Sequence, residues 1–243
     1  MINKESPLPV YFKLQMELKN KIEDARWAPG QKIPPERKLA DDYGLSVGTV
    51  KKALMNLVNE GYLQRMQGKG TFVTGTRLRR ENLRYYRLLR HFEDDEEADL
   101  TIQFIDLKKV KPDPEQIQYL NLHKNQKIYI MTRLFYINKI PLIHCISHFP
   151  CDMFPQLEKN PFSIFEKTPL YVAFEDIYGV TTVNNQQLYS SIAVDSECAK
   201  LLNVKKGSPI LLIEMLSFTY KEKVYEYRKS YCMTEGFKVY GEL

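Results

Sequence analysis

The chain has 243 residues, of which 44% are hydrophobic and 27% charged, which is typical of a globular protein and enough for two domains. Residues 1–80 hold 15 Lys/Arg and 8 Asp/Glu, whereas the remainder holds 20 and 22, so the basic first part is a candidate for contact with a polyanion, although small domains are also often basic by chance. No stretch approaches the ~20 uninterrupted apolar residues of a membrane helix, and the N-terminus has no apolar signal segment, so we expect a cytoplasmic protein without a membrane partner.

Three helices are predicted in the first 60 residues. The first has an apolar face with steps of three and four, formed by Tyr11, Leu14, Leu18 and Ile22. The second begins at Pro34-Pro35-Glu36, where proline suits a first turn, and ends at Gly44 with Leu39, Ala40 and Tyr43 inward. The third has Ser46 as its N-cap, ends at Gly61 and buries Val50, Leu54, Leu57 and Val58.

A β-hairpin is predicted next, over residues 62–73. Two β-prone arms flank the turn Gly68-Lys69-Gly70, and glycines of this kind mark a hairpin. Three helices and a hairpin, with a three-residue turn between the second and third helices, are typical of a winged helix-turn-helix. We therefore predict a DNA-binding domain over residues 1–74 and a polar, basic linker over residues 75–84.

Residues 85–243 have the mixed pattern of an α/β domain, which makes the chain as a whole α+β. Strands are expected at residues 100–110, 127–137, 142–149 and 188–193, and a closing hairpin at residues 209–220 and 223–233. Helices are expected at residues 114–120, 162–178 with an interruption at Pro169, and 196–202.

The first domain carries specific motifs, namely PPERKLA at residues 34–40, GLSVGTVKKAL at 44–54, EGY at 60–62 and GKGTFV at 68–73. In this order and spacing they resemble the GntR family of bacterial regulators over residues 8–74. The resemblance implies that the helix from Ser46 enters the major groove of DNA and that the hairpin tip touches the minor groove.

The predicted DNA contacts have matching chemistry. An arginine at the start of the second helix can fork onto guanine or phosphate, the first turn of the third helix reaches base edges, lysines neutralise phosphates, and wing glycines allow close approach. Each residue alone has an ordinary alternative as a solvated charge or a turn glycine. The predicted contacts are Arg37, Lys38, Ser46, Val47, Thr49, Lys51, Lys52, Gly68, Lys69 and Gly70.

This domain also departs from the family pattern. The family usually has arginine at the position of Val47, and often at that of Lys51. Val47 offers only apolar contact, for example to a thymine methyl, and Lys51 cannot form a bidentate pair. The operator is therefore free to differ from the commonest half-site of the family.

The second domain resembles the UTRA effector domain of the HutC-like branch of that family. The resemblance rests on TRL at residues 132–134, IPL at 140–142, AKLLNVKKGSPIL at 199–211 and VYEY at 224–227. It implies a chorismate-lyase-like α/β fold that binds a small metabolite, often a phosphorylated sugar, another organic acid or a phosphonate.

Three residues are predicted to bind this effector. By the resemblance, Arg133 contacts its phosphate or carboxylate and Glu226 faces the pocket. Ser163, at the start of a helix, offers a hydroxyl beside backbone N–H groups. Each has a structural alternative, which for Arg133 is an ion pair within the protein. Cys145 replaces a usual glutamate and Met233 a frequent arginine, so the ligand class stays open.

Metal and catalytic chemistry are not predicted. The four cysteines form no Cys-x-x-Cys pair, which suits free thiols in a reducing compartment. His144 and His148, with Cys145 and Cys151 nearby, invite a zinc hypothesis, but four residues of strand separate the two histidines by about 13 Å. The chain has no P-loop and no Gly-x-Ser-x-Gly, His-Glu-x-x-His or Gly-x-Gly-x-x-Gly motif, so we expect no cofactor.

The sequence thus predicts a sequence-specific transcriptional repressor whose operator affinity is modulated by a small anionic metabolite. One reader domain has too small an interface for tight specific binding, so we expect a homodimer on palindromic double-stranded DNA. Two alternatives stay open, a chorismate-lyase-like enzyme acting on a small organic acid and a DNA binder without a ligand. The effector, the operator and the direction of the ligand response are not determined.

Overall fold

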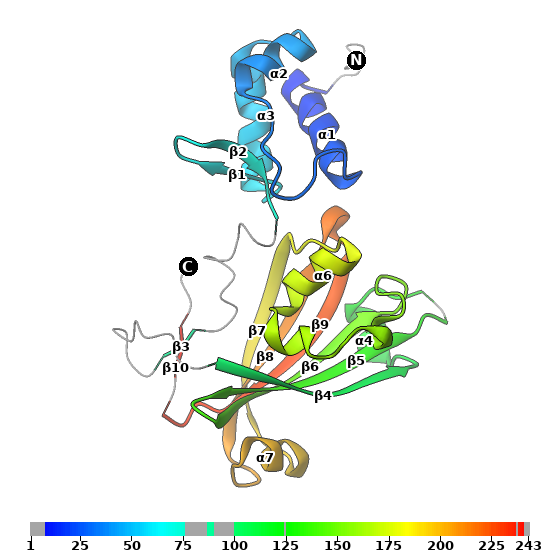
Figure 1. The fold of residues 1–243 in the computed structure, drawn as a ribbon, viewed down its shortest axis with the longest axis vertical. Helices are drawn as coiled ribbons and strands as arrows, with labels where there is room; N and C mark the ends of the chain where they lie inside the picture. The colour runs from blue at the N-terminus through cyan, green and yellow to red at the C-terminus, as the bar shows by residue number, and fades with distance from the viewer. Residues whose placement is uncertain (1–7, 76–86, 90–99, 124, 237, 241–243) are drawn as a thin grey trace. The chain divides into compact units, whose positions relative to one another are not determined.

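Two separate units make up the chain in the computed structural model, Met1–Asn82 and Leu83–Leu243. The structure describes residues 8–75, 87–89, 100–123, 125–236 and 238–240 (Figure 1). Of the predicted linker, only Gly75 lies within these described residues. Each unit is described by itself below.

The first unit has three helices and a two-stranded hairpin, as predicted. The helices are α1 (Val10–Glu23), α2 (Glu36–Tyr43) and α3 (Val47–Asn59), and the antiparallel strands are β1 (Leu63–Met66) and β2 (Gly70–Val73). The predicted apolar faces are largely confirmed, although Tyr11, Tyr43 and Val58 are only half-buried. The fully buried core residues include Leu14, Leu18, Ile22, Leu39, Val50, Leu54 and Leu57.

The helix-turn-helix has the predicted junction between α2 and α3. Gly44 ends α2 with φ 61°, a left-handed conformation that costs glycine little. The Ser46 hydroxyl accepts a hydrogen bond from the Thr49 N–H at 3.2 Å and so caps α3. The start of α2 differs from the prediction, because Pro35 is extended (ψ 155°) and precedes the helix instead of opening it.

The second unit is built on a six-stranded antiparallel sheet in the order β4-β5-β6-β9-β8-β7 (Figure 1). The strands are β4 (Leu100–Val110), β5 (Ile128–Ile137), β6 (Ile140–Pro150), β7 (Asn184–Ala193), β8 (Pro209–Phe218) and β9 (Val224–Cys232). A separate pair joins β3 (Arg87–Leu89) to β10 (Lys238–Tyr240). The strand predicted at residues 188–193 is longer in the structure and begins at Asn184. Its first four residues are polar and lie on an edge strand, where apolar and polar side chains need not alternate, so the sequence pattern did not reveal them.

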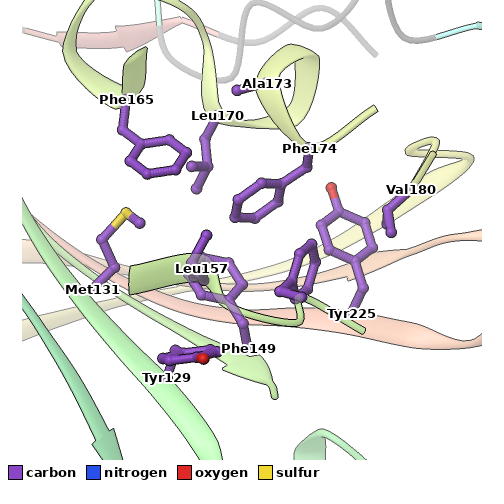
Figure 2. Close-up of a cluster of buried hydrophobic side chains, with 11 residues drawn as sticks. Tyr129, Met131, Phe149, Leu157, Phe165, Leu170, Ala173, Phe174, Val180 and Tyr225 are labelled. Atoms are coloured by element: carbon purple, nitrogen blue, oxygen red, sulfur yellow. The ribbon is translucent and has the colours of Figure 1, made fainter. Parts of the chain in front are cut away.

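Helices cover both faces of this sheet. On one face, α5 (Ile164–Lys167) and α6 (Leu170–Tyr178) pack on Tyr129, Met131 and Phe149, as Figure 2 shows. On the other face, α7 (Ser196–Leu202) packs near Leu134, and Leu120, next to α4 (Pro114–Tyr119), packs on Ile128. The single helix expected over residues 162–178 is two short helices, because Pro169 cannot continue a helix and instead precedes α6.

Candidate functional site

The first turn of α3 presents the side chains predicted to read bases. Val47 is 43% exposed and Lys51 is exposed. The hydroxyls of Ser46 and Thr49 lie 2.8 Å apart and hydrogen-bond to each other, which holds both at the helix start. The exposed surface of this turn thus combines one apolar side chain with two ordered hydroxyls.

Two of the predicted DNA-binding lysines already have partners within the unit. The Lys38 ammonium lies 2.7 Å from Asp42, one helical turn later, and this hydrogen bond raises the pKa of Lys38. The Lys52 Nζ lies 3.9 Å from the centroid of the Tyr11 ring, on α1. Arg37 is exposed on α2. DNA contact by Lys38 or Lys52 therefore competes with an existing interaction.

The hairpin between β1 and β2 carries the predicted wing residues. Gly68 and Gly70 have φ values of 70° and 123°, which L side chains rarely adopt. At Gly70 a Cβ would also lie 2.7 Å from Cε of Lys32, so the glycine gives that lysine room along the wing. Lys69 is exposed at the tip.

Sequence reasoning missed two basic residues of this wing. Arg65 on β1 bonds Glu36 on α2 at 2.8 Å, which ties the wing to the helix-turn-helix. Lys32 joins the hairpin through a bridge to Phe72. Alternation along the predicted arm could have shown that Arg65 faces outward, but no sequence signal pointed to Lys32.

In the second unit, Arg133 lies mid-strand on β5 and is only 1% exposed. Among the described residues, its Nε and Nη2 atoms have no hydrogen-bond partner. Burial lowers the pKa of this guanidinium, and the thiol of Cys145 faces it from β6. Two buried nitrogen atoms of a cation without hydrogen-bond partners are costly. An anionic group is predicted to meet Arg133, and the described residues supply none that is hydrogen-bonded to these two atoms.

Glu226 on β9 is also 1% exposed, and its carboxylate is already occupied. It accepts two hydrogen bonds from Arg228, at 2.7 Å from Nε and 2.8 Å from Nη2, and one from the Ser217 hydroxyl at 3.1 Å. Burial alone would raise the pKa of Glu226, but Arg228 beside it holds that pKa below its usual value. Glu226 thus forms a buried ion pair as the molecule stands.

Ser163 differs from Arg133 and Glu226 in its burial. It is exposed, and its side chain makes no capping hydrogen bond to α5, which has only four residues. The neighbouring Phe162 stacks on Phe104 of β4 with ring centroids 4.1 Å apart. Phe104 is the cross-strand partner of Arg133, so Ser163 lies near the β4 side of the Arg133 position.

The sequence did not single out Arg228 or the serines around it. Arg228 is 4% exposed, and Ser147, Ser217 and Ser230 are fully buried. The signal was present on β9, because Glu226, Arg228 and Ser230 alternate and side chains two residues apart share a face.

The histidines and cysteines do not form a metal site in the part of the chain that the structure describes, where no group of three or more His, Cys, Asp or Glu side chains has a suitable arrangement. His144 stacks on Tyr231 and His148 on Tyr227. All four cysteines are free thiols.

A groove of about 380 Å³ lined by Leu120, Pro150 and Val224 contains none of the predicted site residues.

Comparisons with known proteins agree with this arrangement. Residues 11–73 match the family model of "Bacterial regulatory proteins, gntR family", and residues 96–238 match that of the UTRA domain. The chain is 30% identical over 231 residues to the HTH-type transcriptional repressor NagR of Bacillus subtilis, covering 94% of this chain and 92% of that protein. It is 24% identical to the histidine utilization repressor of Pseudomonas putida, covering 90% and 86%.

Solved structures share the fold. The possible transcriptional regulator YydK from Bacillus subtilis has a TM-score of 0.57 at 22% identity, covering 95% of this chain and 99% of that chain. PhnF from Mycobacterium smegmatis has a TM-score of 0.55 at 15% identity, covering 97% of this chain and 99% of that chain.

Among the described residues, no helix is long and apolar enough to cross a membrane.

Proposed function

Because the chain belongs to the GntR family of bacterial regulatory proteins and carries a UTRA domain, we propose that it is a repressor released from a palindromic operator by a small anionic metabolite. It is a transcriptional regulator and not an enzyme, since its relatives are regulators, and the alternative of a chorismate-lyase-like enzyme is therefore wrong. We place its action in the cytoplasm, where operator DNA is.

In this proposal α2, α3 and the wing formed by β1 and β2 contact the operator. Ser46, Val47 and Thr49 meet base edges in the major groove, while Lys51 contacts phosphate and Arg37 contacts guanine or phosphate. The wing residues Gly68, Lys69 and Gly70 approach the minor groove. Lys38 and Lys52 add phosphate contacts when they leave Asp42 and Tyr11.

The proposed homodimer is supported by the two edges of the large sheet. The β7 edge has ten residues without a charge or a bulge, and Leu188 and Tyr189 are 65% and 59% exposed. The β4 edge carries a register shift and the charges of Asp106, Lys108 and Lys109, which are usual protections against edge pairing. Antiparallel pairing of β7 with β7 of a second copy obeys a twofold axis and fits a palindromic operator.

One observation carries the sensor part of the proposal, namely the unpaired Nε and Nη2 of buried Arg133. An effector phosphate or carboxylate would satisfy these donors. Ser163 contributes its hydroxyl, and Glu226 orients a hydroxyl or amine group of the ligand. Cys145 and Met233, at positions with polar residues in the family, belong to an apolar cluster with Ile213, which favours a less polar ligand body than a full sugar.

The test is selection of binding sites from random DNA with the full chain, followed by a metabolite screen on the selected operator by fluorescence anisotropy. We expect a palindrome with half-sites about one helical turn, ~34 Å, apart or closer, and release by anionic metabolites. A monomer on a single asymmetric half-site would contradict the dimer, and an affinity unchanged by every metabolite would support a DNA binder without a ligand.

A further inference from the structure

Buried polar side chains form a continuous patch on the sheet face that carries Arg133. Cross-strand register aligns Arg133 of β5 with Cys145 of β6 and Ser230 of β9, and the next row aligns Ser147 of β6 with Arg228 of β9. These five side chains are between 0% and 4% exposed. Together with Glu226, they place two guanidinium groups and one carboxylate in a region closed to water.

The charges of this patch do not balance. Glu226 compensates Arg228 through a bidentate pair, and Ser217 donates to the same carboxylate. Arg133 has no hydrogen-bonded carboxylate partner among the described residues, and Arg228 opposes its charge while Glu226, already paired with Arg228, favours it. The described patch therefore has two positive charges and one negative charge, and the carboxylate of Glu226 is already paired with Arg228.

We infer that Arg228 is a second anion-binding residue of the sensor and that Glu226 is its resident counter-ion, which the effector anion replaces. This inference rests on the proposed effector site at Arg133 and deepens it. The incoming anion bridges the two guanidinium groups, which it can do because each arginine presents several N–H donors in a rigid fork. The carboxylate oxygens of Glu226, no longer bonded to Arg228, then accept a hydrogen bond from a donor group of the ligand.

The exchange predicts the chemical class of the ligand. One negative charge neutralises the patch, whereas two would leave an excess negative charge in a dry site. Glu226, being a carboxylate, accepts hydrogen bonds only, so the ligand needs a hydroxyl or amine group beside its anionic group. We therefore expect a monoanion with a nearby donor, such as a hydroxy acid or a phosphodiester of a polyol, instead of a phosphate monoester.

The experiment uses two matched probes on the full chain, dimethyl phosphate with a single charge and methyl phosphate, which is mostly doubly charged at pH 7.5. Binding is measured by calorimetry at constant ionic strength. We expect dimethyl phosphate to bind the wild type more tightly than methyl phosphate. The opposite order, or no binding of either probe, would overturn the single-charge class.

Variants separate the roles. Because dimethyl phosphate has no donor for Glu226, Glu226→Gln should bind it about tenfold more tightly, since Arg228 is then free of its counter-ion. Arg228→Gln should weaken binding about tenfold or more, and Lys229→Gln, next on β9 but paired with Glu115, should leave it unchanged. Weaker or equal binding by Glu226→Gln overturns the exchange.

A second readout needs no variant at the ion pair. The Nε NMR signals of both Arg133 and Arg228 should shift when wild-type protein is saturated with dimethyl phosphate. A shift of Arg133 alone overturns the role of Arg228 but leaves the proposed effector site intact. Binding that is unaffected by Arg133→Gln contradicts the proposed site itself, so the two failures are distinguishable.

Discussion

The ammonium of Lys52 lies 3.9 Å from the centre of the Tyr11 ring and so joins α3 to α1, although Lys52 is exposed like the adjacent Lys51. We expect Lys51→Ala to weaken operator binding alike for all sequences and to reduce the salt slope by about one. Lys52→Ala should instead lower the free energy of unfolding by about 0.5–1 kcal/mol, with a smaller loss in affinity. Salt titrations of operator binding and urea unfolding measure the two effects. Equal salt slopes for both variants would contradict this division.

Arg37 is the candidate for base-specific contact outside α3. If it reads guanine, Arg37→Ala should cost about 1–3 kcal/mol in operator binding and blur the preference at one base pair. Lys69→Ala at the wing tip is the matched control, because removal of a phosphate-binding charge should weaken binding to every sequence equally. A uniform loss of affinity for Arg37→Ala, measured on a set of single-base operator variants, would assign it to phosphate.

Arg133 is expected to carry the ligand response without contributing to DNA binding. A typical coupling of about 1–3 kcal/mol would weaken operator binding about 5- to 150-fold when the effector binds. Arg133→Ala should abolish that change and leave the affinity of the ligand-free protein intact, as measured by anisotropy with the metabolite found in the screen. A variant that still responds at wild-type concentrations would make Arg133 a structural residue.

The exposed edge of β7 is expected to form the dimer interface. Leu188→Lys should shift the chain to monomers in analytical ultracentrifugation, because a charge on an edge strand opposes edge pairing. Ile105→Lys is the matched control, since Ile105 is 39% exposed on the opposite edge strand, β4. A stable dimer with lysine at position 188 would place the interface elsewhere.

The ion pair of Glu226 and Arg228 predicts a pH dependence of stability. The pKa of Glu226 is held below the usual 4.5, so its ionisation stabilises the fold fully above about pH 4.5 and loses that effect as the pH falls through the lowered pKa. Glu226→Gln should lower the free energy of unfolding by about 3–5 kcal/mol at neutral pH. The difference from the wild type should shrink in acid.

Urea unfolding between neutral and acidic pH measures this difference. Glu222→Gln, which changes an exposed carboxylate on the β8–β9 connection, is the control and should run parallel to the wild type. A wild-type-to-variant difference that stays constant at all pH values would show that Glu226 contributes no charge-dependent stability.

Local patterns in the sequence predicted most elements. The steps of three and four from Leu14 to Ile22, the N-cap at Ser46 and the breaking Gly44 each act within a few residues, so they determine helix positions without the rest of the fold. The same holds for β4 and α7, whose bounds match the expected residues 100–110 and 196–202. The candidate residue Arg133, by contrast, came from the resemblance to the UTRA domain and not from a local pattern.

Other features depended on the tertiary structure. Arg228 pairs with Glu226 on the same strand, but the patch around them forms only because β9 lies between β6 and β8, an order that local periodicity does not encode. Lys52 lies over the Tyr11 ring, and the Lys32 side chain lies beside Gly70, although more than thirty positions of the chain separate the two residues of each pair. Sequence determined which side chains face inward or outward, because that follows from the period of each element. The partner of a buried charge was decided by the fold, because partners come from strands and helices that only packing brings together.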